Sequence, residues 1–293
     1  MVKTIIEAGS FAGAADRLHR SQSSVSYAVH QLQQQLGVAL FETVGRRALL
    51  TSVGQALFKR ADEVLKQVGL LEECSVALQK GYEAELKLVM DAAFPMSVLL
   101  NALAASADTL KYTRIQLHEE ILSGAEEALT EQSADISIAA HLPQGMLADP
   151  ILSTDFIAVI APSHPLAKEH GLGNSELRQH RQVVIRDSGR KNPRDVGWLG
   201  ADQRWTVSSL QTAQEVVESG LAFAWLPLHQ VKQALLGGSL QPLPLASGQR
   251  RTISFYLVTK EQERLGKGAQ LLCQALRKAA TQFQQQASEN LPE

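Results

Sequence analysis

The stretch from Ser52 to Gln79 has the pattern of one long helix, and it divides the sequence into two parts of different texture. Its apolar residues recur at alternating spacings of four and three, which is a heptad pattern. They are Leu57, Ala61, Val64, Val68, Leu71 and Leu78, with Ser75 as an interruption. Charged residues crowd the other faces, so a seam between two copies is at least as well supported as a core helix of one domain. We expect residues 59–84 to be a linker helix that dimerises the chain.

The part before this helix is helical in pattern and has short connections. Ser10 and Ser21 are predicted N-caps, because a serine before an apolar-periodic run accepts a bond from the first helical turn. Gly37 ends the second of the capped helices. Two short helices separated by a tight polar turn form a helix-turn-helix pattern. The apolar segments 38–41 and 48–51 flank a basic turn and predict a small two-stranded wing.

The part after the long helix alternates short apolar strands with helices, which indicates a parallel sheet and βαβ crossovers. The expected strands are 86–90, 114–117, 136–139, 156–160, 182–185, 205–207, 221–225 and 254–258, and the expected helices are 95–107, 123–132, 209–219, 228–236 and 268–284. This number of strands fits two lobes, with a ligand cleft between the ends of their strands. We expect one lobe from residues 85–160 and 257–285, a second from 161–256, and a flexible polar tail at 286–293.

The distribution of charge favours a polyanionic partner at one end of the chain. The net charge is only −2, yet residues 1–60 carry +4 and the remainder carries −6. A basic N-terminal module on an acidic body is the asymmetry expected when one end meets nucleic acid.

Several other classes of protein are excluded by the sequence. The only cysteines, Cys74 and Cys273, are far apart, which argues against a disulfide framework or a cysteine zinc site and favours a reducing cytoplasm. The longest wholly apolar run, Leu221–Leu228, is much shorter than the roughly 18 residues of a membrane span, and the N-terminus has no secretory signal pattern. We expect no metal, no cofactor and no membrane partner.

Catalytic motifs are weak throughout. The S-x-x-K spelling at Ser188–Lys191 lacks its companion motifs, and His118 lacks the second helical histidine of a zinc protease. No nucleophile-elbow, Walker A or dinucleotide motif is present. We expect no enzyme activity.

The second short helix carries the chemistry for DNA recognition. Its first turn consists of small polar residues, so the positive end of the helix dipole is open to phosphate. Gln22 suits a bidentate contact with adenine, and basic residues at the wing tip suit a neighbouring groove or backbone. The predicted DNA contacts are Ser10, Ser21, Gln22, Ser23, Ser24, Ser26, Tyr27, His30, Arg46, Arg47 and Thr51. The alternative is a polar helix in an ordinary bundle.

Residues 1–58 closely resemble the winged helix-turn-helix of LysR-type transcriptional regulators. The matching residues are Gly9-Ser10-Phe11, Ala14-Ala15, Leu18, Ser21-Gln22-Ser23, Val25-Ser26, Leu32, Leu36-Gly37-Val38, Leu40-Phe41, Leu50-Thr51 and Gly54. Later segments also match, at Ala134–Ile138, His164–Leu166 and Gly220–Pro227. The resemblance implies an α/β protein with an all-α winged helix-turn-helix head, a linker helix, and two Rossmann-like regulatory subdomains like those of type 2 periplasmic binding proteins.

The resemblance also implies a function and a set of partners. The protein is expected to be a bacterial, cytoplasmic, sequence-specific transcriptional regulator, controlled by a small-molecule effector bound between the two subdomains. Its partners would be double-stranded DNA with an imperfect palindrome, the effector, further copies of itself as a homodimer and homotetramer, and RNA polymerase if it activates transcription. The alternative is a cytoplasmic small-molecule sensor whose head mediates protein contacts.

By matching segments, the effector would meet helix starts and strand ends. The candidate residues are Phe94, Met96, Ser97, His141, Arg186, Ser188, Ser208, Ser209 and Phe223. Free N–H groups at helix starts favour a carboxylate or a similar anion. Phe94 and Phe223 fit a role in the core better than a ligand contact.

The chain departs from the family pattern at three places. Gln33 stands where the family usually has glutamate, and Thr43 stands where it usually has arginine, so one backbone contact to DNA is expected to be missing. The first helix starts close to Met1, several residues later than usual, which indicates a mis-set start or a truncation.

Overall fold

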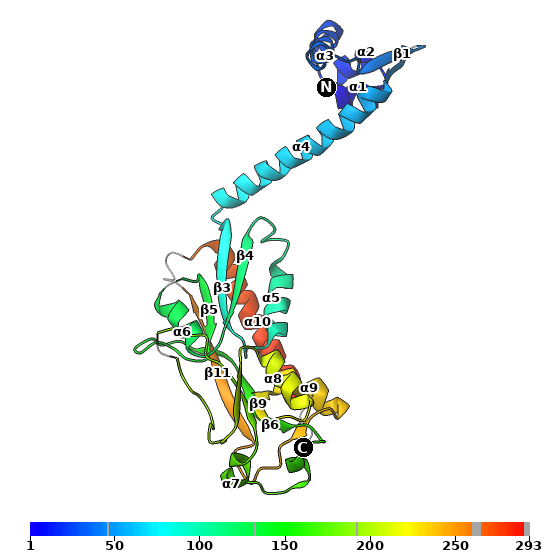
Figure 1. The fold of residues 1–293 in the computed structure, drawn as a ribbon. Coiled ribbons are helices and arrows are strands. Elements are labelled where there is room, and N and C mark those ends of the chain that lie inside the picture. The colour runs from blue at the N-terminus through cyan, green and yellow to red at the C-terminus, as the bar shows by residue number, and fades with distance from the viewer. Residues whose placement is uncertain (46, 132, 192, 260–264, 290–293) are drawn as a thin grey trace. The chain divides into compact units, whose positions relative to one another are not determined.

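The computed structural model describes residues 1–45, 47–131, 133–191, 193–259 and 265–289 (Figure 1). The chain divides into two compact units, Met1–Ala77 and Leu78–Glu293, here called the head and the body. Each is described by itself.

The head is a three-helix cluster with a β-hairpin and a long last helix. Its elements are α1 (Val2–Ala8), α2 (Phe11–Arg17), α3 (Gln22–Leu36), β1 (Phe41–Val44), β2 (Arg47–Leu50) and α4 (Ser52–Gln79). The predicted caps are confirmed: Ser10 and Ser21 cap α2 and α3, and Gly37 ends α3 in the left-handed conformation. Small apolar side chains of α2 and α3 form one core with Ile5 of α1 and Ala48 of β2.

The first wing strand lies later than predicted. β1 begins at Phe41, which pairs with Leu50 of β2, whereas the predicted strand covered residues 38–41. The preceding backbone is bound elsewhere, because Thr51 donates to the carbonyl oxygens of Ala39 and Leu40. Gly54 of α4 packs so closely on the Leu40 carbonyl oxygen that a Cβ there would collide with it.

The heptad residues of α4 lie on its surface. The exposed fractions are 62% for Val64, 45% for Val68 and 69% for Leu71. In a core helix, the apolar stripe would be covered by the rest of the same chain. The apolar stripe of α4 remains exposed in the single chain, so α4 differs from a core helix.

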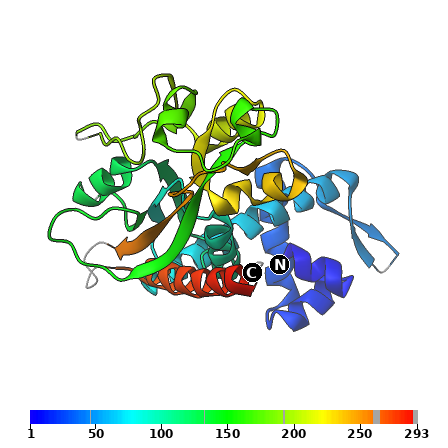
Figure 2. The ribbon, with the colours of Figure 1, turned by 90° about the horizontal axis from the view of Figure 1, so that it is seen from below.

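The body is an α/β unit of two lobes (Figures 1 and 2). Its elements up to residue 160 are β3 (Glu85–Asp91), α5 (Met96–Ser106), β4 (Arg114–Glu120), α6 (Ser123–Thr130), β5 (Ile136–Ala139) and β6 (Pro150–Ile160). The next are η1 (Pro165–Lys168), α7 (Asn174–Arg178), β7 (Gln182–Ile185), β8 (Arg204–Val207), α8 (Leu210–Glu218) and β9 (Ala224–Pro227). The last are α9 (Leu228–Gly237), β10 (Gln241–Pro242), β11 (Arg250–Thr259) and α10 (Lys267–Glu289).

Two long strands connect the lobes. The main sheet has the order β10-β6-β11-β5-β3-β4, with β9 also on β6. β3 is parallel to β4 and β5, and β7 is parallel to β8, as predicted, whereas β11 is antiparallel to both β5 and β6. Along β6, Leu152 packs in the first core and Ile157 in the second. The change of lobe therefore falls inside β6 rather than at residue 160, and Phe255 of β11 already lies in the first core, before residue 257.

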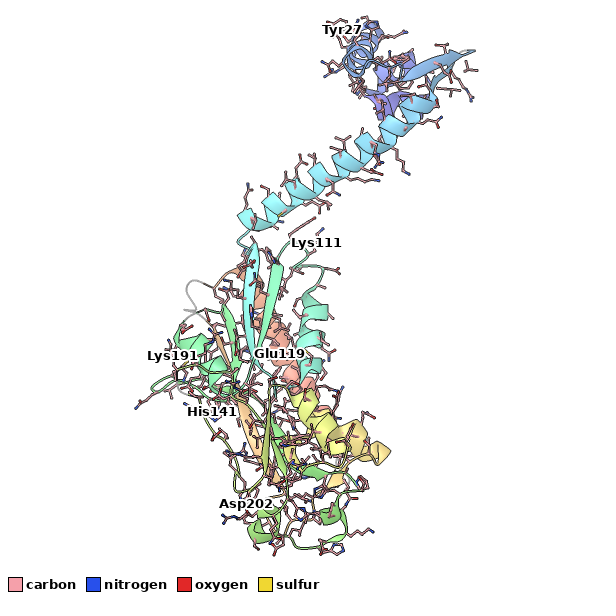
Figure 3. All side chains as sticks on the ribbon, in the orientation of Figure 1. Tyr27, Lys111, Glu119, His141, Lys191 and Asp202 are labelled. Carbon is pink, nitrogen blue, oxygen red and sulfur yellow. The ribbon has the colours of Figure 1, made fainter. Side chains whose placement is uncertain are left out.

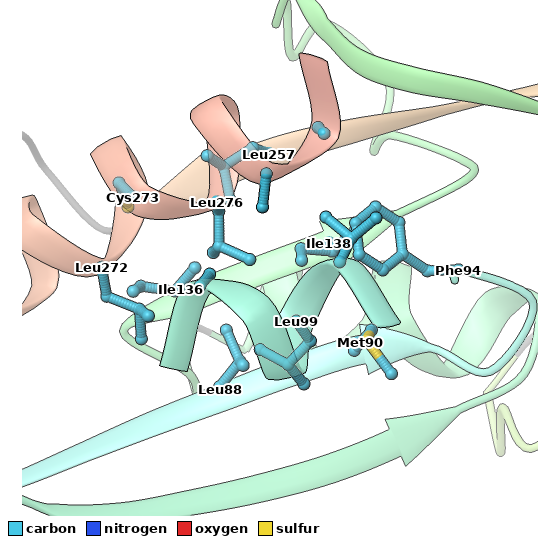
Figure 4. Close-up of a cluster of buried hydrophobic side chains, with 14 of the residues drawn as sticks. Leu88, Met90, Phe94, Leu99, Ile136, Ile138, Leu257, Leu272, Cys273 and Leu276 are labelled. Carbon is cyan, nitrogen blue, oxygen red and sulfur yellow. The ribbon is translucent and has the colours of Figure 1, made fainter. Parts of the chain in front are cut away.

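The core of the first lobe is completed by the C-terminal helix. Side chains at alternate positions of β3 (Leu86, Leu88 and Met90) face the same cluster as Leu272 and Leu276 of α10 (Figure 4). Successive side chains of a strand point to opposite faces, so Val89 points away from this cluster and packs with alanines of α6.

Other departures from the predicted elements concern boundaries. β9 begins at Ala224 rather than at residue 221, because Phe223 bridges to Gln182 of β7 before the chain turns onto β6. The last helix continues to Glu289, so residues 286–289 of the expected tail are helical, and residues 290–293 lie outside the described part. The short elements η1, α7 and β10 were not predicted.

Candidate functional site

The start of α3 presents an open polar surface. Ser21 accepts a bond from Ser24 N at 3.2 Å, and its hydroxyl also lies near those of Ser23 and Ser24. All of these contacts are local, so the first-turn backbone is ordered without covering the helix end.

One face of α3 is buried and the other carries the predicted DNA contacts. Val25 and Val29 are in the head core. The side chains on the other face are exposed: Gln22, Ser23, Ser24, Ser26, Tyr27 and His30. Tyr27 is 67% exposed, and its hydroxyl accepts a bond from Gln31 (Figure 3). The predicted residues of α3 therefore share one accessible surface.

The remaining predicted DNA residues take different positions. Ser10 accepts a bond from Gly13 N, and Thr51 accepts one from Gly54 N while donating to Ala39, so both hydroxyls stabilise the head itself. Arg47 is exposed at the end of the β1–β2 hairpin. Arg46 lies outside the described residues.

Gln33 has a structural role that explains how the chain tolerates its departure from the family pattern. Its Oε1 accepts bonds from the backbone N–H groups of Leu40 (2.7 Å) and Phe41 (3.2 Å), which fixes the entry to the wing. A neutral carboxamide oxygen is sufficient for this. Thr43 is exposed on β1, where the family usually has arginine.

The body contains a cavity of about 630 Å³ between its lobes. Its walls come from the ends of β3 and β5 in the first lobe, from β7 and the loop after it in the second, and from the connecting strand β11. His141, one of the predicted effector residues, lines it. A cavity of this size that is mainly apolar, with a few convergent polar groups, is typical of a small-molecule site.

The other predicted effector residues do not line this cavity. Arg186, Ser188 and Ser208 line an adjoining polar hollow of about 780 Å³. Phe94 and Phe223 are buried in the cores, with the Phe94 ring 5.6 Å from that of Phe255. Neither hollow is lined by the other three candidates, which lie at helix starts: Met96, Ser97 and Ser209. Ser209 caps α8 through its hydroxyl.

A carboxylate of the chain itself occupies the start of α6. Asp187, from the second lobe, accepts bonds from Ser123 N (3.1 Å) and Ser123 Oγ (2.8 Å) in the first lobe. It also accepts from Gly189 N and Arg194 N. Burial alone would raise the pKa of Asp187, but these bonds hold it below its usual range. The chain itself therefore supplies an anion at this helix start.

The loop formed by residues 187–191 makes further bonds across the cleft. Ser188 donates to Glu120 Oε2 at 2.6 Å and accepts from Ile121 N at 2.8 Å. The backbone N–H groups of residues 190 and 191 donate to the Glu127 carboxylate. Two glycines permit this close approach, since a Cβ on Gly124 would collide with Ser188 Oγ and one on Gly189 with Ser123 Oγ. We call this set of bonds the inter-lobe clasp.

Two titratable groups on the cavity wall have pKa values shifted by their surroundings. Burial raises the pKa of Asp91 to about 6, although bonds from the Ala93 and Leu122 N–H groups oppose the shift. Burial lowers the pKa of His141, and the Arg194 and Arg251 charges lower it further. His141 is therefore a neutral imidazole at pH 7.

Several cavity residues were not predicted from the sequence. Asp91 ends a strand that was predicted, so its position at a strand end was the available signal. Trp198 and Arg194 lie in a long irregular loop, and Arg251 lies on a strand that begins earlier than expected. Periodicity carries no information about where such residues point.

Two classes of site are not found in the described part of the chain. There, no group of three or more potential metal ligands comes together. In the same residues, no helix is both long enough and apolar enough to cross a membrane.

Comparisons with known proteins agree with this architecture. Residues 1–55 match the bacterial regulatory helix-turn-helix protein, lysR family, and residues 79–281 match the LysR substrate binding domain. The *Escherichia coli* (strain K12) regulator YeeY is 31% identical over 244 residues, covering 79% of this chain and 77% of that protein. The *E. coli* regulator YhaJ is 31% identical over 242 residues, covering 80% of each.

Solved structures show the same fold. CrgA, a LysR-type transcriptional regulator from *Neisseria meningitidis*, superposes with a TM-score of 0.53 at 22% identity, covering 95% of this chain and 97% of that one. ArgP from *Mycobacterium tuberculosis* gives 0.54 at 18% identity, covering 96% and 95%. LysR-family proteins are transcriptional regulators that bind DNA and small-molecule effectors and form oligomers. The chain belongs to this family and is an effector-controlled, DNA-binding transcriptional regulator.

Proposed function

We propose that the exposed face of α3 reads the operator. The observation that carries this proposal is that Gln22, Ser26 and His30 are all exposed on a helix whose opposite side is fixed in the head core. The capped helix start adds N–H groups that favour a phosphate. Arg47 adds a positive charge at the hairpin end, suited to the DNA backbone.

The test uses DNA selected from a random-sequence pool by the purified full chain. Fluorescence anisotropy then measures its affinity for Ser26→Asp, Gln22→Ala and, as a control of equal charge on the same helix, Gln35→Glu. We expect Ser26→Asp to weaken binding at least 100-fold, Gln22→Ala about 10-fold, and Gln35→Glu about 2-fold, on the scale of one to three kcal/mol per base contact. Unchanged affinity in both α3-face variants would contradict the assignment.

Salt dependence distinguishes DNA contact from a protein-contacting head. Phosphate contacts release counterions, so the affinity for DNA falls steeply between 50 and 200 mM salt, by about 10³-fold or more for six or more contacts. Arg47→Gln should reduce the slope by about one. A flat salt response would favour the protein-contact alternative.

The self-association surface that we propose is the heptad face of α4. A continuous row of exposed apolar side chains, from Ala61 to Leu71, supports a two-helix seam that places two heads on the half-sites of an imperfect palindrome. In sedimentation experiments, Val64→Asp should dissociate the dimer and the off-seam control Leu70→Asp, at an exposed position on the other side of α4, should not. A tetramer would require a second interface, which the same measurement detects as a species four times the chain mass.

The effector site that we propose is the inter-lobe cavity. Ligand binding there would change how dimers hold DNA only if the ligand has different affinity for two arrangements of the lobes. Contact with RNA polymerase would follow if the outcome is activation. Because its partner is chromosomal DNA, the protein would act in the cytoplasm, as a regulator without turnover of its ligand. Detection of ligand conversion would contradict this.

A further inference from the structure

Three cationic side chains line the cavity between the lobes, Arg194, Arg250 and Arg251, and Arg251 is the one that lies over an aromatic ring of the wall. The Arg251 guanidinium lies 6.0 Å from the centre of the Phe156 ring, and its Nη1 is close to Gly197. Among the described residues, no carboxylate lies within ion-pair distance of Arg251. Its charge reaches across the cavity, since it is one of the groups that act on His141.

Arg194, another cationic residue of the cavity wall, already pairs with a carboxylate. Arg194 Nη2 lies 2.7 Å from Glu126 Oε2, and the Arg194 backbone N–H donates to Asp187. A ligand that used Arg194 would have to displace Glu126. Arg251 is therefore a better anchor for an anionic group than Arg194.

The cavity also has an aromatic wall. The rings of Trp198 and Trp225 lie 6.1 Å apart, and Phe156 lines the same space. Trp225 is oriented by the bond from its Nε1 to the Gly248 carbonyl oxygen. Flat aromatic faces of this kind favour a flat apolar group in the ligand.

The start of α6 is not available to the ligand. In a two-lobed sensor its N–H groups would suit a ligand's carboxylate, but Asp187 already accepts from both Ser123 donors. A second anion beside Asp187 would meet like-charge repulsion. The acidic group of the ligand must therefore bind elsewhere in the cavity.

One deeply buried polar atom on the cavity wall has no partner in the described structure. Gln182 is only 3% exposed, and its Nε2 donates to Trp198 O at 2.7 Å, while its Oε1 accepts no bond. The Nδ1 atom of His141 is likewise unpartnered. A buried acceptor without a donor costs free energy, so the Gln182 oxygen points to a ligand that also carries a hydrogen-bond donor. His141 Nδ1 donates or accepts according to its tautomer.

We propose that the effector is a small aromatic carboxylic acid whose carboxylate pairs with Arg251, whose ring stacks on Trp198 and Phe156, and whose polar donor faces Gln182. The inference rests on the proposed function only in taking the inter-lobe cavity as the effector site. Because the inter-lobe clasp keeps the carboxylate of the ligand away from the start of α6, the clasp also sets the orientation of the ligand in the cavity.

The test is isothermal titration calorimetry of the full chain with four probes. Indole-3-acetate carries the ring, the acid and an indole N–H donor, and phenylacetate carries the ring and the acid without a donor. In their amides, indole-3-acetamide and phenylacetamide, a neutral carboxamide replaces the carboxylate. We expect at least one acid to bind, and its amide to bind at least 10-fold more weakly, as for the loss of one charge-assisted hydrogen bond. No binding by either acid at millimolar concentration, or equal binding by acid and amide, would overturn the proposal.

Variants then locate the charge. Arg251→Gln should remove the preference for acid over amide, and Arg251→Lys should keep part of it. The matched control Arg277→Gln, at an exposed position of α10 that lines neither hollow, should leave the preference unchanged. If Arg251→Gln fails to fold, judged by circular dichroism, the Lys variant and the acid–amide pair decide the outcome. Asp187→Asn should leave affinity for the acid within about 2-fold, and a 10-fold gain would instead place the anion at α6.

Operator binding is measured separately and without any probe. If the unsubstituted chain selects no DNA sequence, the proposed role of α3 is overturned and the calorimetric result still stands. Conversely, if no aromatic acid binds in the cavity, only the assigned ligand class is overturned.

Discussion

The starts of α3 and α6 satisfy the same physical requirement by opposite means. α3 is capped by Ser21, three residues from the N–H that it accepts, and the surface in front of the helix stays open. α6 is capped by Asp187, which is 64 residues away in the other lobe. A local cap leaves a helix start free to meet an external anion, whereas a long-range cap uses the helix start to hold two lobes together.

The strongest way to break this comparison is Asp187→Ala. It removes the acceptor for four donors, of which Ser123 is 2% exposed, so the free energy of unfolding of the body should fall by about 3 kcal/mol. Urea unfolding followed by tryptophan fluorescence measures this, because all three tryptophans lie in the body. The exposed Asp149→Ala is the matched control and should change stability by less than about 0.5 kcal/mol. Equal effects would show that the clasp contributes little.

Gly189→Ala sharpens the comparison by testing the closeness of the lobes rather than the charge. The added methyl group would collide with Ser123 Oγ, so we expect a loss of about 2 kcal/mol in the same unfolding measurement. Gly237→Ala, whose added Cβ would meet open space in the same lobe, should be neutral or slightly stabilising. If the two alanine variants behave alike, the lobes are not held at this distance in solution.

The pH dependence of Asp91→Asn tests the buried carboxyl beside the start of α6. Because burial raises the pKa of Asp91 to about 6, the folded state holds a proton that the unfolded state has lost, and stability falls as the pH rises from about 4 to 6. Asp91→Asn should therefore be more stable than the unsubstituted chain by about 1 to 2 kcal/mol at pH 7.5, and equal to it at pH 4. If the variant and the unsubstituted chain differed in stability by the same amount at the two pH values, the raised pKa would be contradicted.

Asp187 should show the opposite sign. Its pKa is lowered, so its contribution is present above the pKa of the unfolded chain and is lost as the pH falls through the lower, folded value. Repeating the Asp187→Ala comparison at acidic pH should reduce the difference between the variant and the unsubstituted chain.

The smallest expected effect belongs to the local cap. Ser21→Ala removes one exposed bond to Ser24 N and should destabilise α3 by about 1 kcal/mol. Hydrogen exchange of the first α3 amides measures this, with Ser26→Ala as a control that alters no cap. Faster exchange in both variants would show that the cap is not the cause.

Sequence patterns predicted the head well because its contacts are local. The caps Ser10 and Ser21 and the end at Gly37 follow from residues three or four positions apart, which periodicity and capping preferences describe. The first wing strand was misplaced because its entry depends on Gln33, whose side chain binds backbone seven and eight residues further along the chain.

In the body, the order of strands and helices was predictable but the cavity was not. Alternating apolar residues give β3 and β5, yet no local pattern shows that Asp187 reaches Ser123 or that Arg251 lies beside Phe156. The predicted effector residues followed helix starts and strand ends. Of these, His141 lines the cavity, whereas Phe94 is held in the core by its edge contact with Phe255.

The place of α10 in the first lobe has a consequence for synthesis on the ribosome. β3 emerges early, but Ala269, Leu272 and Leu276, which cover its apolar face, are translated only after the second lobe. The first lobe therefore cannot close its core until the second lobe has been made, and its exposed strands need protection until α10 emerges. A nonsense mutation just before α10 would leave every DNA-reading residue in place and still yield an aggregation-prone product.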